Sequence, residues 1–185
     1  MKYKSWKCWV VAVALMSLSI ILTRLCGINI GETVRITLGR LPIMLASIWL
    51  GPIFGMIVGG AADLLGAMLS TGINPLLTIP ELLCGLLPYV FYSGFGLYKT
   101  GGGKRKIKHA AGVLATVLLT KIITQGIIKT MVLAYLYEIS AEGFFLFLGT
   151  RCAITVGEGV VETIFICLLL RNKVISGSID RIKND

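Results

Sequence analysis

The residues of this chain that could do chemistry stand in strongly apolar surroundings. Lys121, Gln125 and Lys129 are four positions apart, so they share one face of a helix. A second polar stripe has spacings of four, three and four and consists of Arg151, Thr155, Glu158 and Glu162. Two stripes of predominantly opposite charge on neighbouring helices should face each other. Because charge in a membrane interior is expensive, the stripes indicate either internal ion pairs or a polar cavity that binds a solute.

These two interpretations of the stripes differ in what the charges contact. In the structural interpretation, Lys121 and Lys129 pair with Glu158 and Glu162 and hold the helices together. In the functional interpretation, some of these groups line a cavity and bind a solute. We favour the functional interpretation, because buried ion pairs are poor sources of net stability.

Further charges lie in and beside other apolar segments. Residues 27–41 are less apolar than their neighbours and contain Glu32, Arg35 and Arg40, while Asp63 lies in a later apolar stretch. These groups either form local pairs, Glu32 with Arg35 or Asp63 with Arg40, or the segment 27–41 folds over an anionic solute. For Asp63 we favour a structural role, in such a pair or with backbone groups.

The elements that must position these residues are membrane helices. Hydrophobic residues make up 56% of the chain and charged residues 15%, whereas soluble domains are nearer half apolar and a quarter charged. This composition disfavours a soluble enzyme, a disordered chain and a nucleic-acid-binding protein. A spanning helix needs about 20 mainly apolar residues. We predict an all-α integral membrane bundle, one domain over residues 1–185, with six helices at about 6–26, 41–50, 52–70, 80–98, 110–137 and 144–170.

The positive charges test the number of helices. The net charge is +9, and twelve of the eighteen cations lie in three clusters, at residues 2–7, 99–108 and 171–183. With six helices, all three clusters fall on one side of the membrane. That side is the cytoplasm, because Lys and Arg are enriched in cytoplasmic segments. We therefore expect a cell-membrane protein with both termini in the cytoplasm.

Other motifs favour packing over chemistry. The five cysteines have no metal-ligand spacing and His109 is the only histidine, so we expect no catalytic centre, no metal site and no cofactor. Gly51, Gly55 and Gly59 have the spacing that lets membrane helices pack closely. No Lys-Ser/Thr pair follows these glycines, which excludes a phosphate-binding loop.

One block of the sequence resembles a known family. Between residues 35 and 66 the chain reads Arg35-x-x-x-Gly39-x-x-Pro42-Ile43, then Gly51-Pro52-x-x-Gly55, then Asp63-x-x-Gly66. With six helices, a small chain and no ATPase motif, this block resembles the S components of energy-coupling factor (ECF) vitamin transporters, most of all the folate-specific S component. The block covers about a fifth of the chain, and the topology covers nearly all of it.

The resemblance implies a substrate-capturing membrane subunit that does not hydrolyse ATP. Such a subunit binds its vitamin tightly near the outer surface. Its partners are a transmembrane coupling subunit and two cytoplasmic ATPases, besides membrane lipid, and no nucleic acid is implied. Family members dock through an Ala-x-x-x-Ala pattern in the first helix. That pattern is absent here, and the small residues expected to form the docking face are Ala12, Ala14 and Ser17.

Folate chemistry suits the polar residues of the chain. The glutamate tail of folate carries two carboxylates, which need cations or amides as partners. The pterin edge presents an amino group beside a ring N–H, and one carboxylate can accept hydrogen bonds from both at once. The residues expected to bind the ligand are Arg35, Arg40, Lys121, Gln125, Lys129, Arg151, Glu158 and Glu162. Candidates for an apolar slot around the rings are Trp49, Tyr89, Phe91 and Phe95.

Three alternatives to a folate S component stay open. The first is an S component for another vitamin. The second is a self-sufficient secondary transporter that takes up protons through Asp63, Glu158 or Glu162; inverted repeats would favour it, and the sequence shows none. The third is an intramembrane enzyme or assembly factor; an enzyme would need a nucleophile–base set or a metal-ligand cluster, and the sequence offers neither.

Overall fold

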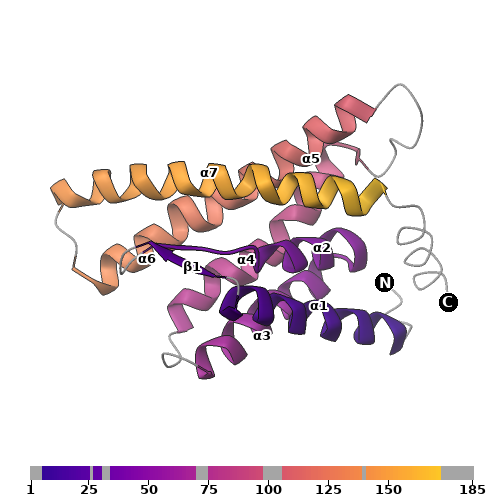
Figure 1. Ribbon diagram of the computed structural model, residues 1–185, viewed down its shortest axis with the longest axis horizontal. Coiled ribbons are helices and arrows are strands. Elements are labelled where there is room, and N and C mark those ends of the chain that lie inside the picture. Colours follow the sequence, from indigo (N-terminus) through magenta and orange to yellow (C-terminus); the bar gives the residue numbers. More distant parts are fainter. Residues whose placement is uncertain are drawn as a thin grey trace.

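The computed structural model describes residues 6–25, 27–30, 34–69, 75–97, 106–138 and 141–171. Within these residues the elements are, in chain order, α1 (Trp6–Leu25), β1 (Ile28–Ile30), β2 (Val34–Ile36), α2 (Arg40–Leu50), α3 (Pro52–Met68), α4 (Pro75–Gly94), α5 (Lys106–Lys121), a π-helix η3 (Ile122–Ile128), α6 (Lys129–Leu136) and α7 (Ala141–Arg171). Because α5, η3 and α6 run on without a break, they form one helix (Figure 1). The described part of the chain thus has six helices, and the predicted helical membrane bundle is confirmed.

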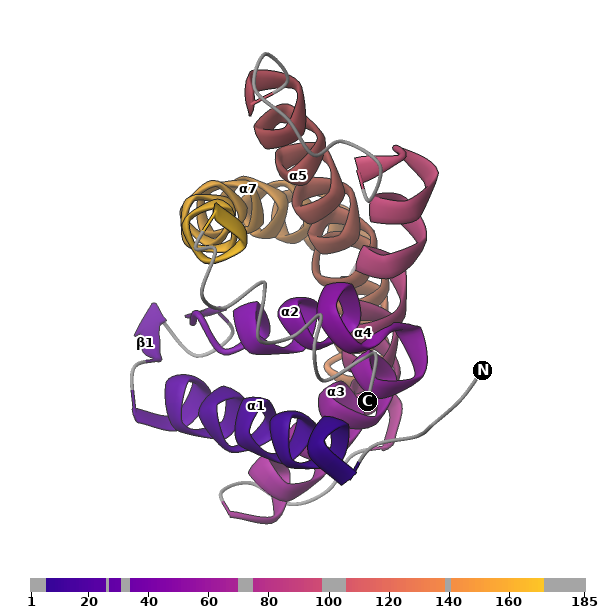
Figure 2. The same ribbon diagram turned by 90° about the vertical axis from the view of Figure 1, so that its right-hand side faces the viewer.

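Four of these helices are long and apolar enough to cross a membrane: α1, α4, the continuous α5–η3–α6 helix and α7. The helices α2 and α3 are shorter, with 11 and 17 residues. An 11-residue helix is about 16 Å long, roughly half of a bilayer's apolar thickness. Helix α2 nevertheless has eight buried residues, because it lies inside the bundle between α1 and α7 (Figure 2).

Helix α2 supplies the centre of the hydrophobic core. Met44, Leu45 and Ile48 pack in one cluster with residues of α4, α5 and α7. Ile43 and Ala46 belong to a second cluster with residues of α1 and α3. Because both faces of α2 are packed against other helices, the first turn of α2 has a fixed position beside the polar residues of the bundle.

A short β-hairpin joins α1 to α2, where the sequence predicts only a loop. The strands β1 and β2 pair antiparallel, with Asn29 opposite Arg35. The pairing satisfies backbone groups that a plain loop would leave to the solvent. The structure describes the backbone of Arg35 but not its side chain, so the ligand-binding role predicted for Arg35 lies outside the described side chains.

Helix α4 begins earlier than the sequence predicts. Its first residue is Pro75, and a proline suits this position because the N–H it lacks would have no helical partner there. The prediction wrongly took Pro80 as the start, and both Pro80 and Pro88 lie inside the helix. Beside Pro88, the backbone N–H of Tyr89 donates to Ser47 Oγ at 3.1 Å. The earlier start places Glu81, the acidic residue of α4, well inside the helix.

Two glycines let α3 and α4 cross at very close range. A Cβ atom on Gly55 would overlap the carbonyl oxygen of Gly85, and a Cβ atom on Gly59 would overlap the carbonyl oxygen of Glu81. Small residues at this spacing allow the backbones of membrane helices to touch. The crossing sets the position of the Glu81 backbone against α3.

Gly51 has a different role from the other two glycines of its row. A Cβ atom on Gly51 would meet nothing within 4 Å, so the predicted packing role does not apply to it. Its φ of +105° lies in the region that favours glycine, and it joins α2 to α3 directly before Pro52. The break between the two short helices therefore depends on its backbone freedom.

Substitution of Gly55 by alanine tests the crossing of α3 and α4. We expect Gly55→Ala to destabilise the protein by about 1–3 kcal/mol, because the new methyl group forces two backbones apart. The measurement is the thermal unfolding midpoint of the purified protein in detergent. Gly157→Ala is the matched control, since Gly157 is exposed on α7 and its Cβ would meet nothing within 4 Å. Equal midpoints for Gly55→Ala and the unchanged chain would contradict the assignment.

Candidate functional site

A cavity of about 360 Å³ lies at one end of the helix bundle. Its walls come from α1, α2, α3, α4, α6 and α7, and from the segment between β2 and α2. This end carries the hairpin, and it is opposite to the end where α1 begins and α7 finishes (Figure 1). The volume falls in the range of pockets that hold small molecules, about 300–1,000 Å³.

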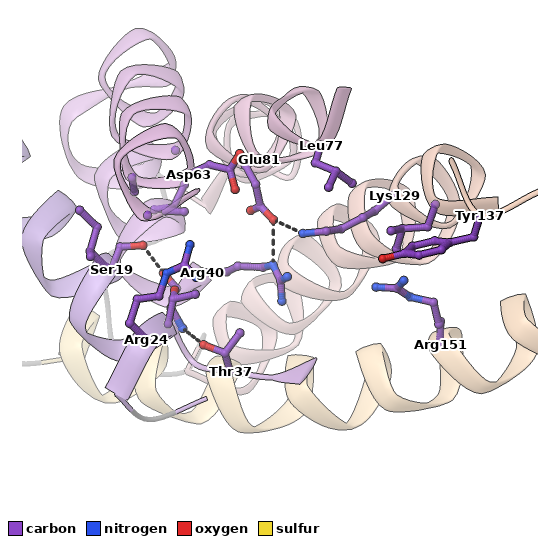
Figure 3. A pocket seen from close by; sticks show the side chains of 18 residues that line it. Ser19, Arg24, Thr37, Arg40, Asp63, Leu77, Glu81, Lys129, Tyr137 and Arg151 are labelled. Carbon is purple, nitrogen blue, oxygen red and sulfur yellow. Dashed lines mark hydrogen bonds and ion pairs between the residues drawn. The ribbon is translucent and has the colours of Figure 1, made fainter. Parts of the chain in front are cut away.

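Glu81 of α4 lies in the middle of the cavity wall (Figure 3). Its Oε1 is 2.8 Å from Lys129 Nζ and 3.5 Å from Arg40 Nε. The same oxygen accepts a hydrogen bond from Gln125 Nε2 at 3.2 Å. One buried carboxylate oxygen therefore connects α4 with α2, η3 and α6.

Glu158 of α7 forms the second centre of this network. Its Oε2 is 2.9 Å from Lys121 Nζ and 3.5 Å from Arg40 Nη1, and its Oε1 accepts the backbone N–H of Thr37 at 3.0 Å. Lys121 Nζ is also 3.1 Å from Glu162 Oε2, and both of these side chains are fully buried. With Glu81 and Lys129, the network contains three cations and three carboxylates, so its formal charges cancel.

The π-helix interrupts the helix that carries the first polar stripe. Lys121 precedes η3, Gln125 lies within it and Lys129 follows it, and the backbone N–H of Lys129 donates to Thr124 O, five residues earlier. This hydrogen-bond pattern widens the turn relative to an α-helix, and such turns are frequent at functional sites. The sequence predicts a regular helix here, because the polar spacing of four residues does not distinguish the two.

One end of the cavity is formed by α1 and α3, where Ser19, Arg24 and Asp63 lie (Figure 3). Asp63 Oδ2 accepts a hydrogen bond from Thr78 Oγ1 at 2.8 Å. The sequence suggested a pair between Asp63 and Arg40, but the guanidinium of Arg40 is engaged by Glu81 and Glu158. Asp63 therefore keeps a carboxylate at the wall of the cavity.

The opposite end of the cavity is formed by α6 and α7, where Lys129, Tyr137 and Arg151 lie (Figure 3). The guanidinium carbon of Arg151 lies over the ring of Phe147, 5.3 Å from its centroid. Arg151 Nη1 is buried and has no hydrogen-bond partner among the described residues. Arg151 thus places at this end of the cavity a guanidinium whose hydrogen-bonding capacity is not fully used by the described residues.

A model of the ECF transporter substrate-specific component family matches residues 9–170. The chain belongs to this family. Its members, the S components, are integral membrane proteins that serve as substrate-binding subunits of transporters and are not enzymes. The predicted family, membrane location and non-enzymatic role are therefore confirmed. No curated protein matches the sequence.

Solved structures of S components share the fold of this chain. FolT bound with folic acid is similar with a TM-score of 0.72 and 20% identity, over 92% of this chain and 96% of FolT. The S component of a bacterial ECF transporter has a TM-score of 0.66 and 20% identity over the same shares. The S component for biotin from an ECF-type ABC transporter has a TM-score of 0.57 and 21% identity, over 86% and 90% of the two chains. At these identities the likeness establishes the fold.

The predicted binding residues of this S component fall into two groups. Arg40, Lys129 and Arg151 line the cavity. The others with described side chains belong to the adjoining network behind the wall, and these are Lys121, Gln125, Glu158 and Glu162. The two polar stripes do face each other, as the contacts of Lys121 show. Lys129, in contrast, pairs with Glu81 and not with the α7 glutamates that the structural interpretation suggested.

Sequence reasoning missed Glu81 because the predicted start of α4 placed it at a helix end, where a charge is ordinary. The signal was available, since Glu81 is the acidic residue of a helix that is apolar enough to span. The candidates for a ring slot are also corrected. None of Trp49, Tyr89, Phe91 and Phe95 is among the residues that line the cavity, whereas Tyr137 is. Trp49 instead packs against both core clusters.

The predicted docking face of α1 is corrected at one residue. Ala12 is 3% exposed and belongs to the core cluster between α1, α2 and α3, so it is not available to a partner. Ala14 and Ser17 are exposed. In the described part of the chain, no group of three or more His, Cys, Asp or Glu side chains could hold a metal ion.

Substitution of Lys121 by methionine tests the network of this S component. We expect Lys121→Met to destabilise the protein by about 3–5 kcal/mol, because two buried carboxylates lose their shared cation. Thermal unfolding in detergent measures the effect. The double variant Lys121→Met/Glu162→Gln is the control, since removing one uncompensated charge should restore part of the loss. A Lys121→Met protein as stable as the unchanged chain would show that the pair does not hold the bundle.

Proposed function

We propose that this S component captures folate in the cavity and delivers it into the cell with an ATP-hydrolysing ECF module. The observation that carries the proposal is the charge of the cavity wall. Four cations and two carboxylates line it: Arg24, Arg40, Lys129, Arg151, Asp63 and Glu81. With Lys121, Glu158 and Glu162, which lie behind the wall and pair with one another and with Arg40, the site has five cations and four carboxylates, a formal excess of 5 − 4 = one positive charge. This excess suits an anionic ligand, and folate is one, because its glutamate tail carries two carboxylates.

Two other vitamins match this charge less well, because riboflavin has no carboxylate and thiamine is itself a cation. Biotin carries one carboxylate, so the titration below is what separates it from folate. Complementary charge governs which ligand such a site accepts, because a charged group that is left unmatched costs several kcal/mol. A folate-bound S component with the same fold supports the assignment.

The direction of capture follows from the charge clusters. Residues 2–7, 99–108 and 171–183 are basic, and in the sequence they adjoin the start of α1, the start of α5 and the end of α7. These three helix ends lie at the same end of the bundle (Figure 1). The excess of Lys and Arg makes that end cytoplasmic. The cavity lies at the other end, so the ligand enters from outside.

Binding of folic acid by the chain alone tests the proposal. We expect native mass spectrometry of the chain, purified in detergent from folate-replete cells, to show an added folate mass. We also expect titration with folic acid to quench the fluorescence of the tryptophans, and a 100-fold excess of biotin or thiamine to leave the titration unchanged.

Other results of this experiment point to the alternatives. A different vitamin mass would keep the capture role and replace folate. If no ligand stays bound and folic acid gives no titration, the capture role fails. Folate uptake by the chain alone in proteoliposomes, driven by a proton gradient, would then establish the secondary transporter.

Delivery requires a surface that the ECF module can reach, and α1 offers one. Ala14 and Ser17 are exposed one helical turn apart, on the face opposite to the buried Ala12 and Leu15. Small side chains let another helix approach closely in a membrane. This face of α1 is the proposed contact with the transmembrane coupling subunit.

Substitution of Ala14 by tryptophan tests this contact. We expect Ala14→Trp to abolish co-purification with the coupling subunit, because the large ring prevents close approach, while folate binding by the isolated chain stays unchanged. Ala153→Trp is the matched control, since Ala153 is equally exposed but lies on α7. Normal co-purification of Ala14→Trp would contradict this docking face and leave the binding proposal intact.

A further inference from the structure

We infer that Arg151 is the residue that selects an anionic ligand, by binding one of its carboxylates at the α6–α7 end of the cavity. This inference rests on the proposed function and names the residue that recognises the glutamate tail of folate. It follows from how the cations of the cavity wall are already engaged, from the surroundings of the Arg151 guanidinium, and from the arrangement of the two ends of the cavity.

The other cations of the wall already have partners. Arg40 lies 3.5 Å from both Glu81 and Glu158, and Lys129 lies 2.8 Å from Glu81. Arg24 is engaged as well. A ligand carboxylate that approached Arg40 or Lys129 would have to compete with a protein carboxylate in contact with the same cation. These residues therefore contribute to the charge of the wall. Because each is already engaged, they are poorly suited to bind a ligand carboxylate as well.

Arg151 is different, because it forms no ion pair with the described residues. The guanidinium carbon lies over the ring of Phe147, 5.3 Å from the ring centroid, a contact with an apolar side chain that supplies no carboxylate. Nη1 is buried and lacks an acceptor among the described residues. A buried donor without a partner is costly, and a carboxylate can accept two parallel N–H bonds from a guanidinium. An arriving carboxylate would thus satisfy a donor that the folded chain leaves unused.

The two ends of the cavity suit the two ends of folate. Asp63 lies at the α1–α3 end and Arg151 at the α6–α7 end, with the contact between Glu81 and Arg40 between them (Figure 3). The Asp63 carboxylate can accept the amino group and the ring N–H of a pterin. Glu158, a carboxylate that the sequence analysis placed among the ligand-binding candidates, is instead held by Lys121, Arg40 and Thr37. The ligand then lies with its pterin toward α3 and its tail toward α7.

The test compares folic acid with its diamide, in which both glutamate carboxylates are neutral amides. Both ligands are titrated into the full chain in detergent, for the unchanged protein and for Arg151→Gln, Arg151→Lys and Arg171→Gln. Arg171 is the matched control, because it lies on the same helix about 30 Å from Arg151 by helix rise. Thermal unfolding of each variant without ligand reports whether it is folded.

We expect Arg151→Gln to raise the Kd for folic acid about 10- to 100-fold, the effect of losing a charged hydrogen bond. Its Kd for the diamide should change less than about 3-fold, since no carboxylate is left to recognise. Arg151→Lys should fall between the unchanged chain and Arg151→Gln, because an ammonium keeps the charge without the paired donors. Arg171→Gln should bind both ligands normally.

Two results would overturn the inference alone. If Arg151→Gln binds folic acid as tightly as the unchanged chain, or if it loses both ligands equally, Arg151 does not recognise a carboxylate of the ligand. Should Arg151→Gln fail to fold, the same comparison is made with Arg151→Lys, whose equal effect on both ligands would also count against the inference. Failure of the unchanged chain to bind folic acid would overturn the proposed function together with this inference.

Discussion

The structure depends on the burial of charge in balanced pairs around Arg40. This residue begins α2 and lies 3.5 Å from Glu81 of α4 and 3.5 Å from Glu158 of α7. Those two glutamates in turn contact Lys129 and Lys121. Each of these charges would be prohibitively expensive alone in an apolar interior, so the helices can pack only in an arrangement where the pairs meet. The network thereby links α2 and α4 with the α5–η3–α6 helix and α7, and it forms the back wall of the cavity.

Close packing brings these charges within reach of one another. Gly55 and Gly59 allow the backbones of α3 and α4 to touch, which sets the position of Glu81. Gly51 ends the short helix α2. Arg40, the first residue of this helix, can therefore lie inside the bundle instead of at a membrane surface. The backbone packing at these glycines therefore helps to determine the shape of the cavity. A methyl group added at Gly55 is expected to displace α4 and in this way to change the geometry of the site.

One fold serves several vitamins in this family. The similar structures include an S component with folic acid and one for biotin, at identities of only 20% and 21% with this chain. In this chain the helices form a cavity at one end of the bundle. Its wall carries an excess of cations, and two of the four, Arg40 and Lys129, are already paired with glutamates. Affinity for an anion therefore depends on the cations that are not paired with a protein carboxylate, and not on the total number of cations.

The sequence by itself determined the membrane bundle, its six helices and the two polar stripes, because apolar length and helical spacing are local properties of the chain. It also offered, as the less favoured of two interpretations, that Lys121 pairs with Glu158 or Glu162, and the structure shows both contacts. Only the tertiary structure decided that Lys129 pairs with Glu81, 48 positions away, and that Ala12 is buried while Ala14 is exposed. Only the tertiary structure left Arg151 without a carboxylate partner among the described residues. These contacts depend on how each helix is rotated and where it crosses its neighbours, and the packing of all six helices together sets both.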